Sequence, residues 1–195
     1  MGKIVIEPLR SSEVDEASVL LSRAFSPTPI PCALVGDPSE EQRLILGGAM
    51  KGMMMDLPGK VFLAKDNGQI IGVMRLVEWP DCQKLPSPEA FKLLPEEMAL
   101  RFVKWRSIWA KHDPKKPHWH IDPLGVLPER QGQGIGSLLV EHFCEYVDKL
   151  KQAGYLETDQ TKNVRFYNRF GFNVVGEAPV LTVTNWFLWR TPQSE

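Results

Sequence analysis

Three alternating glycines constrain this chain more than any other feature. In the stretch PERQGQGIGSLL, from Pro128 to Leu139, glycine occupies positions 132, 134 and 136 directly before an apolar segment with helical periodicity. Glycine is a poor helix former, so its use there indicates that bare backbone is needed. The first N–H groups of a helix have no partner within it, and the helix dipole makes that end positive. The pattern therefore predicts a strand, a turn and a helix that together bind a phosphate group.

The spacing of these glycines excludes the two commonest phosphate-binding loops. A P-loop needs a lysine beside its Ser or Thr, and Ser137, five positions after Gly132, has none. A dinucleotide fingerprint needs a third glycine three positions after Gly134, where Ser137 stands again. Glu157 lies at a suitable distance for a ribose-binding acid, but too little chain follows it to complete a doubly wound fold. We expect neither an ATP-type nor an NAD-type site.

Charge and cysteine content narrow the class of protein. The 195 residues carry a formal net charge of −1, which argues against a nucleic-acid partner. No apolar run reaches the ~18–20 residues needed to cross a bilayer, so we expect no membrane partner. The three cysteines, Cys32, Cys82 and Cys144, form no C-x-x-C pair, which argues against a disulfide framework or a zinc cage. We expect one cytoplasmic domain over residues 1–195.

Apolar periodicity divides the chain into strands and helices. The proline-rich segment 26–38 predicts a loop, and residues 80–117 predict a helical insertion that helps to cover a substrate site. The order β-α-α-β-β-(α insertion)-β-α-β-α-β-β indicates an α/β protein with a mixed sheet and helices on its faces. The expected strands are 3–9, a hairpin over 60–79, 118–126, 155–159, 172–178 and 180–189, and the expected helices are 11–25, 39–57, 95–112, 134–150 and 161–171.

Capping signals define where three of these helices begin or end. Ser12 with Asp15, and Ser39 with Gln42, have the spacing of capping boxes. Gly171 is placed like the glycine that follows a helix C-terminus.

Two motifs stand in register on this framework. Gln131–Gly136 matches the Q/R-x-x-G-x-G/A signature of the GCN5-related N-acetyltransferase (GNAT) superfamily. NVRFYNRFGF, from Asn163 to Phe172, resembles that family's second signature, an asparagine and an aromatic-tyrosine pair on a short helix that leads to Gly-Phe. The predicted order of elements is also the order of the single-domain GNAT fold. The resemblance covers nearly the whole chain and is weakest at 26–58 and 80–117.

A narrower similarity concerns the puromycin N-acetyltransferase-like branch of that family. It rests on HDPKKPHW before the fourth strand, on the helical insertion ahead of it and on LETD in the fifth strand. This similarity implies a small-molecule amine as the acceptor.

The resemblance to the GNAT family implies acetyl-CoA as co-substrate and places its parts. The pyrophosphate would lie on backbone N–H groups of the glycine loop. The pantetheine would lie along the fourth strand and pair with its backbone like an added strand. The asparagine and the aromatic pair of the second signature would complete the site. The residues assigned in this way are Leu124, Gly125, Val126, Gln131, Gly132, Gln133, Gly134, Ile135, Gly136, Ser137, Asn163, Phe166 and Tyr167.

The reaction implied is direct transfer of acetyl from acetyl-CoA to a primary amine within a ternary complex. Tyr167 matches the family's candidate general acid, which protonates the departing thiolate. Backbone N–H groups near Gly125 and Val126 are candidate donors to the developing oxyanion.

The amine must also lose a proton to a base. Glu157 is the first candidate because it interrupts an otherwise apolar strand. His120 is a second, since imidazole titrates near neutrality. Glu78 and His118 remain open as further candidates.

Two other functions stay open. A GNAT-fold protein can bind CoA as a sensor without catalysis, in which case Tyr167 and Glu157 would be dispensable. The alternation of His118, His120 and Asp122 resembles the opening of the H-x-H-x-D-H motif of metal-dependent hydrolases.

The hydrolase motif is incomplete. Pro123 occupies the position of its last histidine, and only His112 and His142 remain as further histidine ligands. We therefore expect no metal. The expected partner is a small-molecule amine, and the chain is expected to be a monomer or a homodimer.

Overall fold

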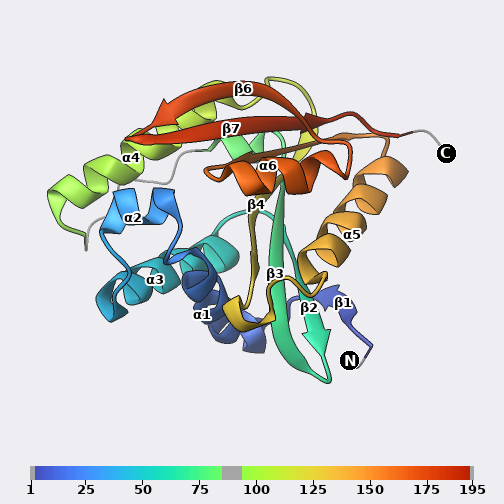
Figure 1. The fold of residues 1–195 in the computed structure, drawn as a ribbon, viewed down its shortest axis with the longest axis horizontal. Coiled ribbons are helices and arrows are strands. Elements are labelled where there is room, and N and C mark those ends of the chain that lie inside the picture. Colours follow the sequence, from blue (N-terminus) through green and yellow to red (C-terminus); the bar gives the residue numbers. More distant parts are fainter. Residues whose placement is uncertain (1–2, 85–93, 194–195) are drawn as a thin grey trace.

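Seven strands form one mixed sheet in the computed structural model, which describes residues 3–84 and 94–193 (Figure 1). The strand order is β1-β2-β3-β4-β5-β7-β6, and every neighbouring pair is antiparallel except β4 and β5. This confirms the expected α/β class. The strands are β1 Val5–Pro8, β2 Lys60–Asp66, β3 Gln69–Glu78, β4 His118–Val126, β5 Ala153–Thr158, β6 Asn173–Val180 and β7 Val183–Arg190.

Helices cover both faces of the sheet. In Figure 1, α1 and α3 lie to the left of β3 and β4, and α5 lies to the right. Two glycines show how closely the layers approach. A Cβ at Gly125 of β4 would lie 2.8 Å from Leu21 of α1, and one at Gly154 of β5 would lie 2.6 Å from Phe143 of α5. The helices are α1 Val14–Phe25, α2 Pro29–Val35, α3 Glu40–Asp56, α4 Glu96–His112, α5 Ile135–Lys149 and α6 Thr161–Asn168.

The core consists of two clusters of unequal size. The larger cluster joins the sheet to α1, α5 and α6, and it includes Leu21, Leu139 and Phe143 with no exposed surface. The smaller cluster lies under α2 and α4, where Phe102 packs with Tyr155 and Phe187. The expected helix in the insertion is confirmed as α4, entered through Pro95, and residues 85–93 lie outside the described residues.

The predicted hairpin over 60–79 is confirmed. Asn67 and Gly68 both have positive φ angles, 49° and 84°, as the two central residues of a type I′ turn require. This turn sets the register that pairs β2 with β3.

The segment 26–38 was expected to be a loop, and that prediction is wrong. Residues Pro29–Val35 form α2, because proline is compatible with the first turn of a helix. Ile30 and Leu34, four residues apart on one helix face, are buried. Gly36, with φ +91°, follows as the C-cap.

The caps differ in detail from the prediction. Ser12 does not begin a helix: it lies in a 3₁₀ turn, Ser11–Glu13, where Glu13 Oε2 accepts the Arg10 N–H at 3.0 Å. Ser39 caps α3 as expected, since its Oγ accepts the Gln42 N–H at 3.0 Å. The Gln42 side chain turns away from Ser39 and donates to the Ser26 carbonyl at 3.0 Å.

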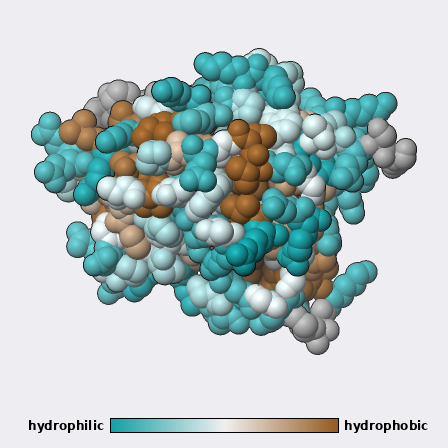
Figure 2. All heavy atoms as spheres, turned by 45° about the horizontal axis from the view of Figure 1, so that its top comes forward, coloured by the Kyte–Doolittle hydropathy of each residue, from teal (hydrophilic) through white to brown (hydrophobic). Residues whose placement is uncertain are grey.

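The face drawn in Figure 2 is mainly hydrophilic, and its brown, apolar atoms form separate patches at the left, in the centre and at the lower right. The left patch is at the end where α2 and α4 lie in Figure 1. On α4, Leu100 is 61% exposed and Val103 is 46% exposed. Within residues 3–84 and 94–193, none of the helices combines the length and the apolar character that a membrane crossing needs.

Candidate active site

The pairing between β4 and β5 stops halfway along both strands. Only His118, Trp119 and His120 of β4 have partners on β5, and the last pair is His120 with Tyr155. Beyond it, β4 continues to Val126 while remaining paired with β3 on its other side. Among the described residues, one edge of β4 therefore lacks a strand partner from residue 121 to residue 126.

The antiparallel ladder decides which backbone groups face this open edge. The Leu127 N–H donates to the Ile71 carbonyl at 3.1 Å, and hydrogen-bonded positions alternate along such a ladder. Gly125, opposite Val73, therefore points its N–H and C=O toward β3. Leu124 and Val126 point theirs toward the open edge. Of the three β4 residues predicted to bind the cofactor, these two present backbone groups there.

The glycine loop leads from this edge into α5. Gly132 and Gly134 have φ angles of +75° and +82°, and a Cβ on either would meet no atom within 4 Å. Gly134 caps α5 without a side-chain hydrogen bond. Within the described residues, the N–H groups of residues 132–137 have no main-chain acceptor. The predicted helix start thus presents consecutive free donors above an open space.

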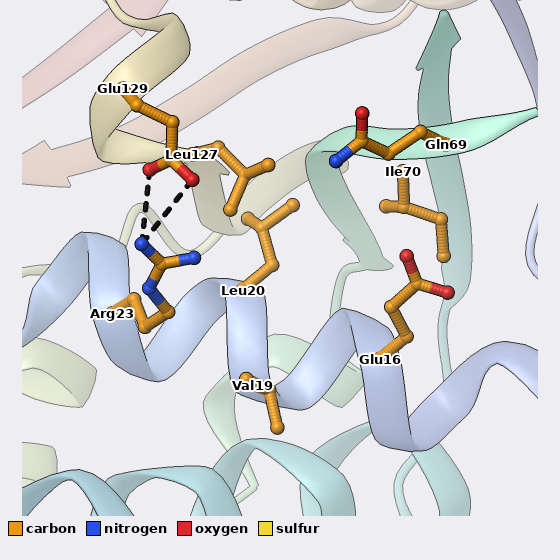
Figure 3. Close-up of a pocket in the computed structure, with 8 residues that line it drawn as sticks. All are labelled: Glu16, Val19, Leu20, Arg23, Gln69, Ile70, Leu127 and Glu129. Carbon is orange, nitrogen blue, oxygen red and sulfur yellow. Dashed lines mark hydrogen bonds and ion pairs between the residues drawn. The ribbon is translucent and has the colours of Figure 1, made fainter. Parts of the chain in front are cut away.

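Ion pairs on both sides hold the loop in place. Arg23 reaches from α1 to Glu129 at 3.1 Å, as Figure 3 shows, and Arg130 pairs with Asp66 at 2.7 Å. A cavity of about 140 Å³ lies beside the Arg23–Glu129 pair, between α1 and the start of β3. None of the predicted site residues lines this cavity, so we do not assign it to the site.

The second signature lies beside the first. Phe166 of α6 packs against the end of the glycine loop. The Phe166 ring lies 3.5 Å from the position that a Cβ on Gly136 would occupy. Asn163 donates through Nδ2 to Thr158 Oγ1 at 3.1 Å, which ties α6 to the end of β5. Tyr167 is buried against Phe166 and Phe172, and this burial raises the pKa of its hydroxyl.

His120 and Glu157 form a buried pair at the point where β4 and β5 separate. His120 Nε2 lies 2.6 Å from Glu157 Oε2, and the two side chains are 2% and 1% exposed. Burial raises the pKa of Glu157. Burial opposes the charged form of His120, but the Glu157 carboxylate and its neighbours raise the His120 pKa well above its ordinary value. The two groups therefore hold a proton between them.

Other polar side chains adjoin His120 on the same face of the sheet. His118, with no exposed side-chain surface, lies 3.5 Å from Asp113 Oδ1 and 3.6 Å from Cys82 Sγ. His120 Nδ1 lies 3.7 Å from Asp113 Oδ2. The sequence did not indicate Cys82 or Asp113, because they stand at the two ends of an irregular insertion with no motif spacing between them.

Comparison with known proteins assigns this architecture to a family. Residues 24–172 match the model of the acetyltransferase (GNAT) family. The chain belongs to this family. A curated relative, the peptidyl-lysine N-acetyltransferase YjaB of Salmonella typhimurium, is 31% identical over 99 residues, which are 47% of this chain and 67% of the relative.

Solved structures agree on the GNAT fold. One, described as histone acetyltransferase HPA2 and related acetyltransferase from Corynebacterium glutamicum, has a TM-score of 0.74 at 21% identity and covers 100% of this chain and 99% of that one. Another, the polyamine N-acetyltransferase of Drosophila melanogaster, has a TM-score of 0.69 at 14% identity and covers 97% and 100%. At these identities the likeness concerns the fold.

The remaining candidates of the sequence do not join this GNAT site. Glu78 is exposed at the end of β3 and lies opposite Trp119 in the register between β3 and β4. The Trp119 ring packs on Tyr146 of α5. Glu78 therefore lies on the face of the sheet opposite to His120.

In the H-x-H-x-D pattern, the Asp122 side chain does not join the side chains of His118 and His120. Asp122 and Pro123 form a bulge opposite Arg75, and Asp122 pairs with Arg106 at 3.1 Å. Burial opposes the charged form of Asp122, but Arg106 and its neighbours lower the pKa of this carboxyl. His112 stacks on Phe187 and His142 contacts Phe62, so the hydrolase ligand set considered from the sequence is not assembled.

Proposed function

We propose that this GNAT protein transfers an acetyl group from acetyl-CoA to the primary amine of a small molecule, by direct transfer in a ternary complex. The observation that carries the proposal is the unpaired edge of β4 next to the row of free N–H groups in the glycine loop. An extended chain that carries a pyrophosphate fits this pair of features, because the edge offers strand-like hydrogen bonds and the loop offers anion donors.

The residues present fit acetyl-CoA as co-substrate. The open space above Gly132 and Gly134 is where a Cβ would obstruct the pyrophosphate. Leu124 and Val126 are the residues of β4 whose backbone groups would pair with the pantetheine. Phe166 and Asn163 border the same region from α6.

The chain's own groups supply the proton transfers. The amine nitrogen attacks the thioester carbonyl, so that a C–N bond forms and the C–S bond breaks. Glu157, oriented by His120, accepts the proton that the amine loses. The N–H of Val126 or Leu124 donates to the oxyanion, and Tyr167 returns a proton to the departing thiolate.

The acceptor would approach from the side of α2 and α4. Glu157 lies on the same face of the sheet as Tyr155, and Tyr155 belongs to the cluster under these two helices. The Ile30 N–H donates to Asp159 at 2.8 Å, which holds α2 beside the end of β5. The Glu157 carboxylate on this side of the sheet favours an acceptor that carries positive charge. The Drosophila neighbour, which forms N-acetylagmatine, supports a small cationic acceptor.

A two-stage experiment tests the proposal. Acetyl-CoA at 100 times its Kd should stabilise the protein by about 2.7 kcal/mol. Thiol release should then be followed with agmatine, spermidine, an arylalkylamine and a lysine-containing peptide. Release with one of the small amines supports the proposal. No thermal shift at millimolar acetyl-CoA refutes it, a shift without turnover favours a CoA sensor, and turnover with the peptide alone refutes the small-molecule acceptor.

A further inference from the structure

The insertion meets the sheet at four buried side chains that the proposed chemistry does not require as a group. They are Cys82, just after β3; Asp113, just after α4; and His118 and His120, on β4. One ligand-type atom from each lies within 4.8 Å of all the others. We call these residues the Cys–Asp–His–His cluster.

Hydrogen bonds outside the cluster fix which atoms point into it. His118 Nδ1 lies 2.7 Å from the Lys116 carbonyl, which can only accept, so Nδ1 carries a hydrogen and Nε2 presents a lone pair. His120 Nε2 lies 2.6 Å from Glu157, and its Nδ1 is buried without a hydrogen-bond partner. His118 therefore presents an acceptor to the cluster, and His120 presents one in the state whose single ring proton is on Nε2, toward Glu157.

Asp113 adds further acceptors. Its side chain is 2% exposed and accepts a hydrogen bond from Gln83 Nε2 at 2.9 Å, while both of its oxygens face the imidazoles. With His120 in that state, the Cys82 thiol carries the proton that faces these acceptors. Buried acceptors that face one another repel unless a cation lies between them.

The ligand types and their proximity favour zinc. Zinc binds sulfur at about 2.3 Å and nitrogen or oxygen at about 2.0–2.2 Å, so the edges of its tetrahedron are roughly 3.3–3.8 Å long. His118 Nε2 lies 3.5 Å from Asp113 Oδ1 and 3.6 Å from Cys82 Sγ, and His120 Nδ1 lies 3.7 Å from Asp113 Oδ2. The four ligand atoms all lie within 4.8 Å of one another, so small side-chain movements would close them around one ion. A thiolate and a carboxylate balance the charge of a divalent ion, and thiolate with imidazole favours zinc over magnesium or calcium.

We propose that the Cys–Asp–His–His cluster binds one zinc ion, which fastens both ends of the 80–117 insertion to β4. Four protein ligands leave no open position, which is typical of a structural zinc site. The proposal departs from the expectation of no metal, which rested on Cys spacing and on the His-x-His-x-Asp pattern. It also defines a role for His120: with Nδ1 on the metal and Nε2–H donating to Glu157, His120 is a positioning residue for that carboxylate.

Metal analysis of the purified full-length protein is the first test. We expect one zinc per chain, and X-ray absorption at the zinc edge should show one sulfur and three nitrogen or oxygen neighbours. Protein stripped with a strong chelator should bind cobalt(II), give a thiolate-to-cobalt charge-transfer band, and lose that band when zinc is added.

Variants assign the ion to this cluster. Cys82→Ser should abolish the charge-transfer band, and Asp113→Asn should reduce zinc retention, whereas Cys144→Ser should change neither. Gln83→Ala, which removes the hydrogen bond to Asp113, should weaken cobalt binding about 10- to 100-fold. If Cys82→Ser does not fold, the wild-type spectra still decide the matter.

Three results would overturn the proposal. The first is wild-type protein that contains no zinc and binds no cobalt, in which case a proton on His120 serves as the cation. The second is bound zinc without a sulfur neighbour. The third is a charge-transfer band that survives in Cys82→Ser but is lost in Cys144→Ser.

Discussion

At the residue scale, the two groups assigned to proton transfer lie on opposite faces of the sheet. Tyr167 belongs to the cluster that packs against α5, whereas Glu157 is paired with His120 on the face covered by α2 and α4. In the proposed reaction, this separation would place the acid on the side of the thioester sulfur and the base on the side of the amine.

Replacing Tyr167 by phenylalanine tests the acid. The hydroxyl has no hydrogen-bond partner among the described residues, so Tyr167→Phe should leave the melting temperature nearly unchanged. Loss of a general acid typically costs about 10²- to 10⁴-fold in rate, so kcat should fall while the Kd for acetyl-CoA is kept. Steady-state kinetics and calorimetric titration give the two quantities.

Tyr146→Phe is the matched control for that measurement, because this tyrosine packs on Trp119 of the sheet and is absent from the proposed chemistry. Unchanged kcat in Tyr167→Phe would remove the assignment of Tyr167 as acid.

At the element scale, the sequence predicted the strands and helices that alternation, caps and glycines define locally. The hairpin around Gly68 and the start of α5 at Gly134 follow from backbone conformations that few residues other than glycine adopt. The glycine loop and the second signature were likewise found because each occupies one continuous stretch. In the structure the two stretches lie beside each other, with Phe166 against Gly136.

What the sequence did not reveal depends on contacts between distant segments. α2 was missed because its prolines indicate a loop, whereas the burial of Ile30 and Leu34 and the bond from the Ile30 N–H to Asp159 stabilise it as a helix. Cys82 and Asp113 were missed because only the return of the insertion to β4 brings them to the histidines.

Gly134 offers a test of the loop as an anion site. Gly134→Ala should raise the KM for acetyl-CoA more than it lowers kcat, because a Cβ there enters the space proposed for the pyrophosphate. The positive φ adds about 1–2 kcal/mol of strain. Initial-rate kinetics at varied acetyl-CoA separate KM from kcat.

The matched control is Gly68→Ala in the β2–β3 turn. Gly68 has nearly the same φ, +84°, and equally open space around its Cβ position. The Gly68→Ala variant should lose a similar amount of stability and keep the wild-type KM for acetyl-CoA. Equal KM values in the two variants would contradict the assignment of the loop.

Asp148 makes a pH-dependent clamp between α5 and the end of β7. Its two oxygens accept from Arg190 at 2.7 and 2.6 Å, and this hydrogen bonding lowers the pKa of Asp148. The clamp is therefore fully formed above the unfolded-state pKa of about 3.9 and is lost as pH falls through the lower folded-state value. Asp148→Asn should cost about 1.5–3 kcal/mol at neutral pH, and the difference from wild type should shrink below pH ~3.

Urea unfolding across this pH range measures the effect. The control is Asp15→Asn, because the ion pair between Asp15 and Lys51 is exposed and should contribute within about 0.5 kcal/mol. A penalty for Asp148→Asn that does not change with pH would show that the charge of Asp148 is not what stabilises the clamp.

At the scale of the whole molecule, the two hydrophobic clusters support different parts of the proposed site. The larger cluster fixes the sheet, the glycine loop and α6, which are the parts proposed to hold acetyl-CoA. The smaller cluster holds α2 and α4 over the side from which the acceptor would approach. Selection of the amine is thus assigned to the less deeply packed part of the protein, where apolar side chains also reach the surface (Figure 2).

Hydrogen exchange should reveal this division. α5 buries five residues in the larger cluster, whereas Phe102 is the buried residue of α4, so the α4 amides should exchange through local openings of lower free energy than those of α5. Phe102→Ala should lower the stability of the smaller cluster by about 3–5 kcal/mol. It should therefore speed amide exchange in α4 and leave exchange in α5 nearly unchanged. Phe143→Ala should instead lower the protection of both helices, because it weakens the cluster on which the whole sheet depends. Equal protection of α4 and α5 in the wild type would show that the insertion and the sheet unfold as one unit, and the acceptor side would then be as rigid as the cofactor side.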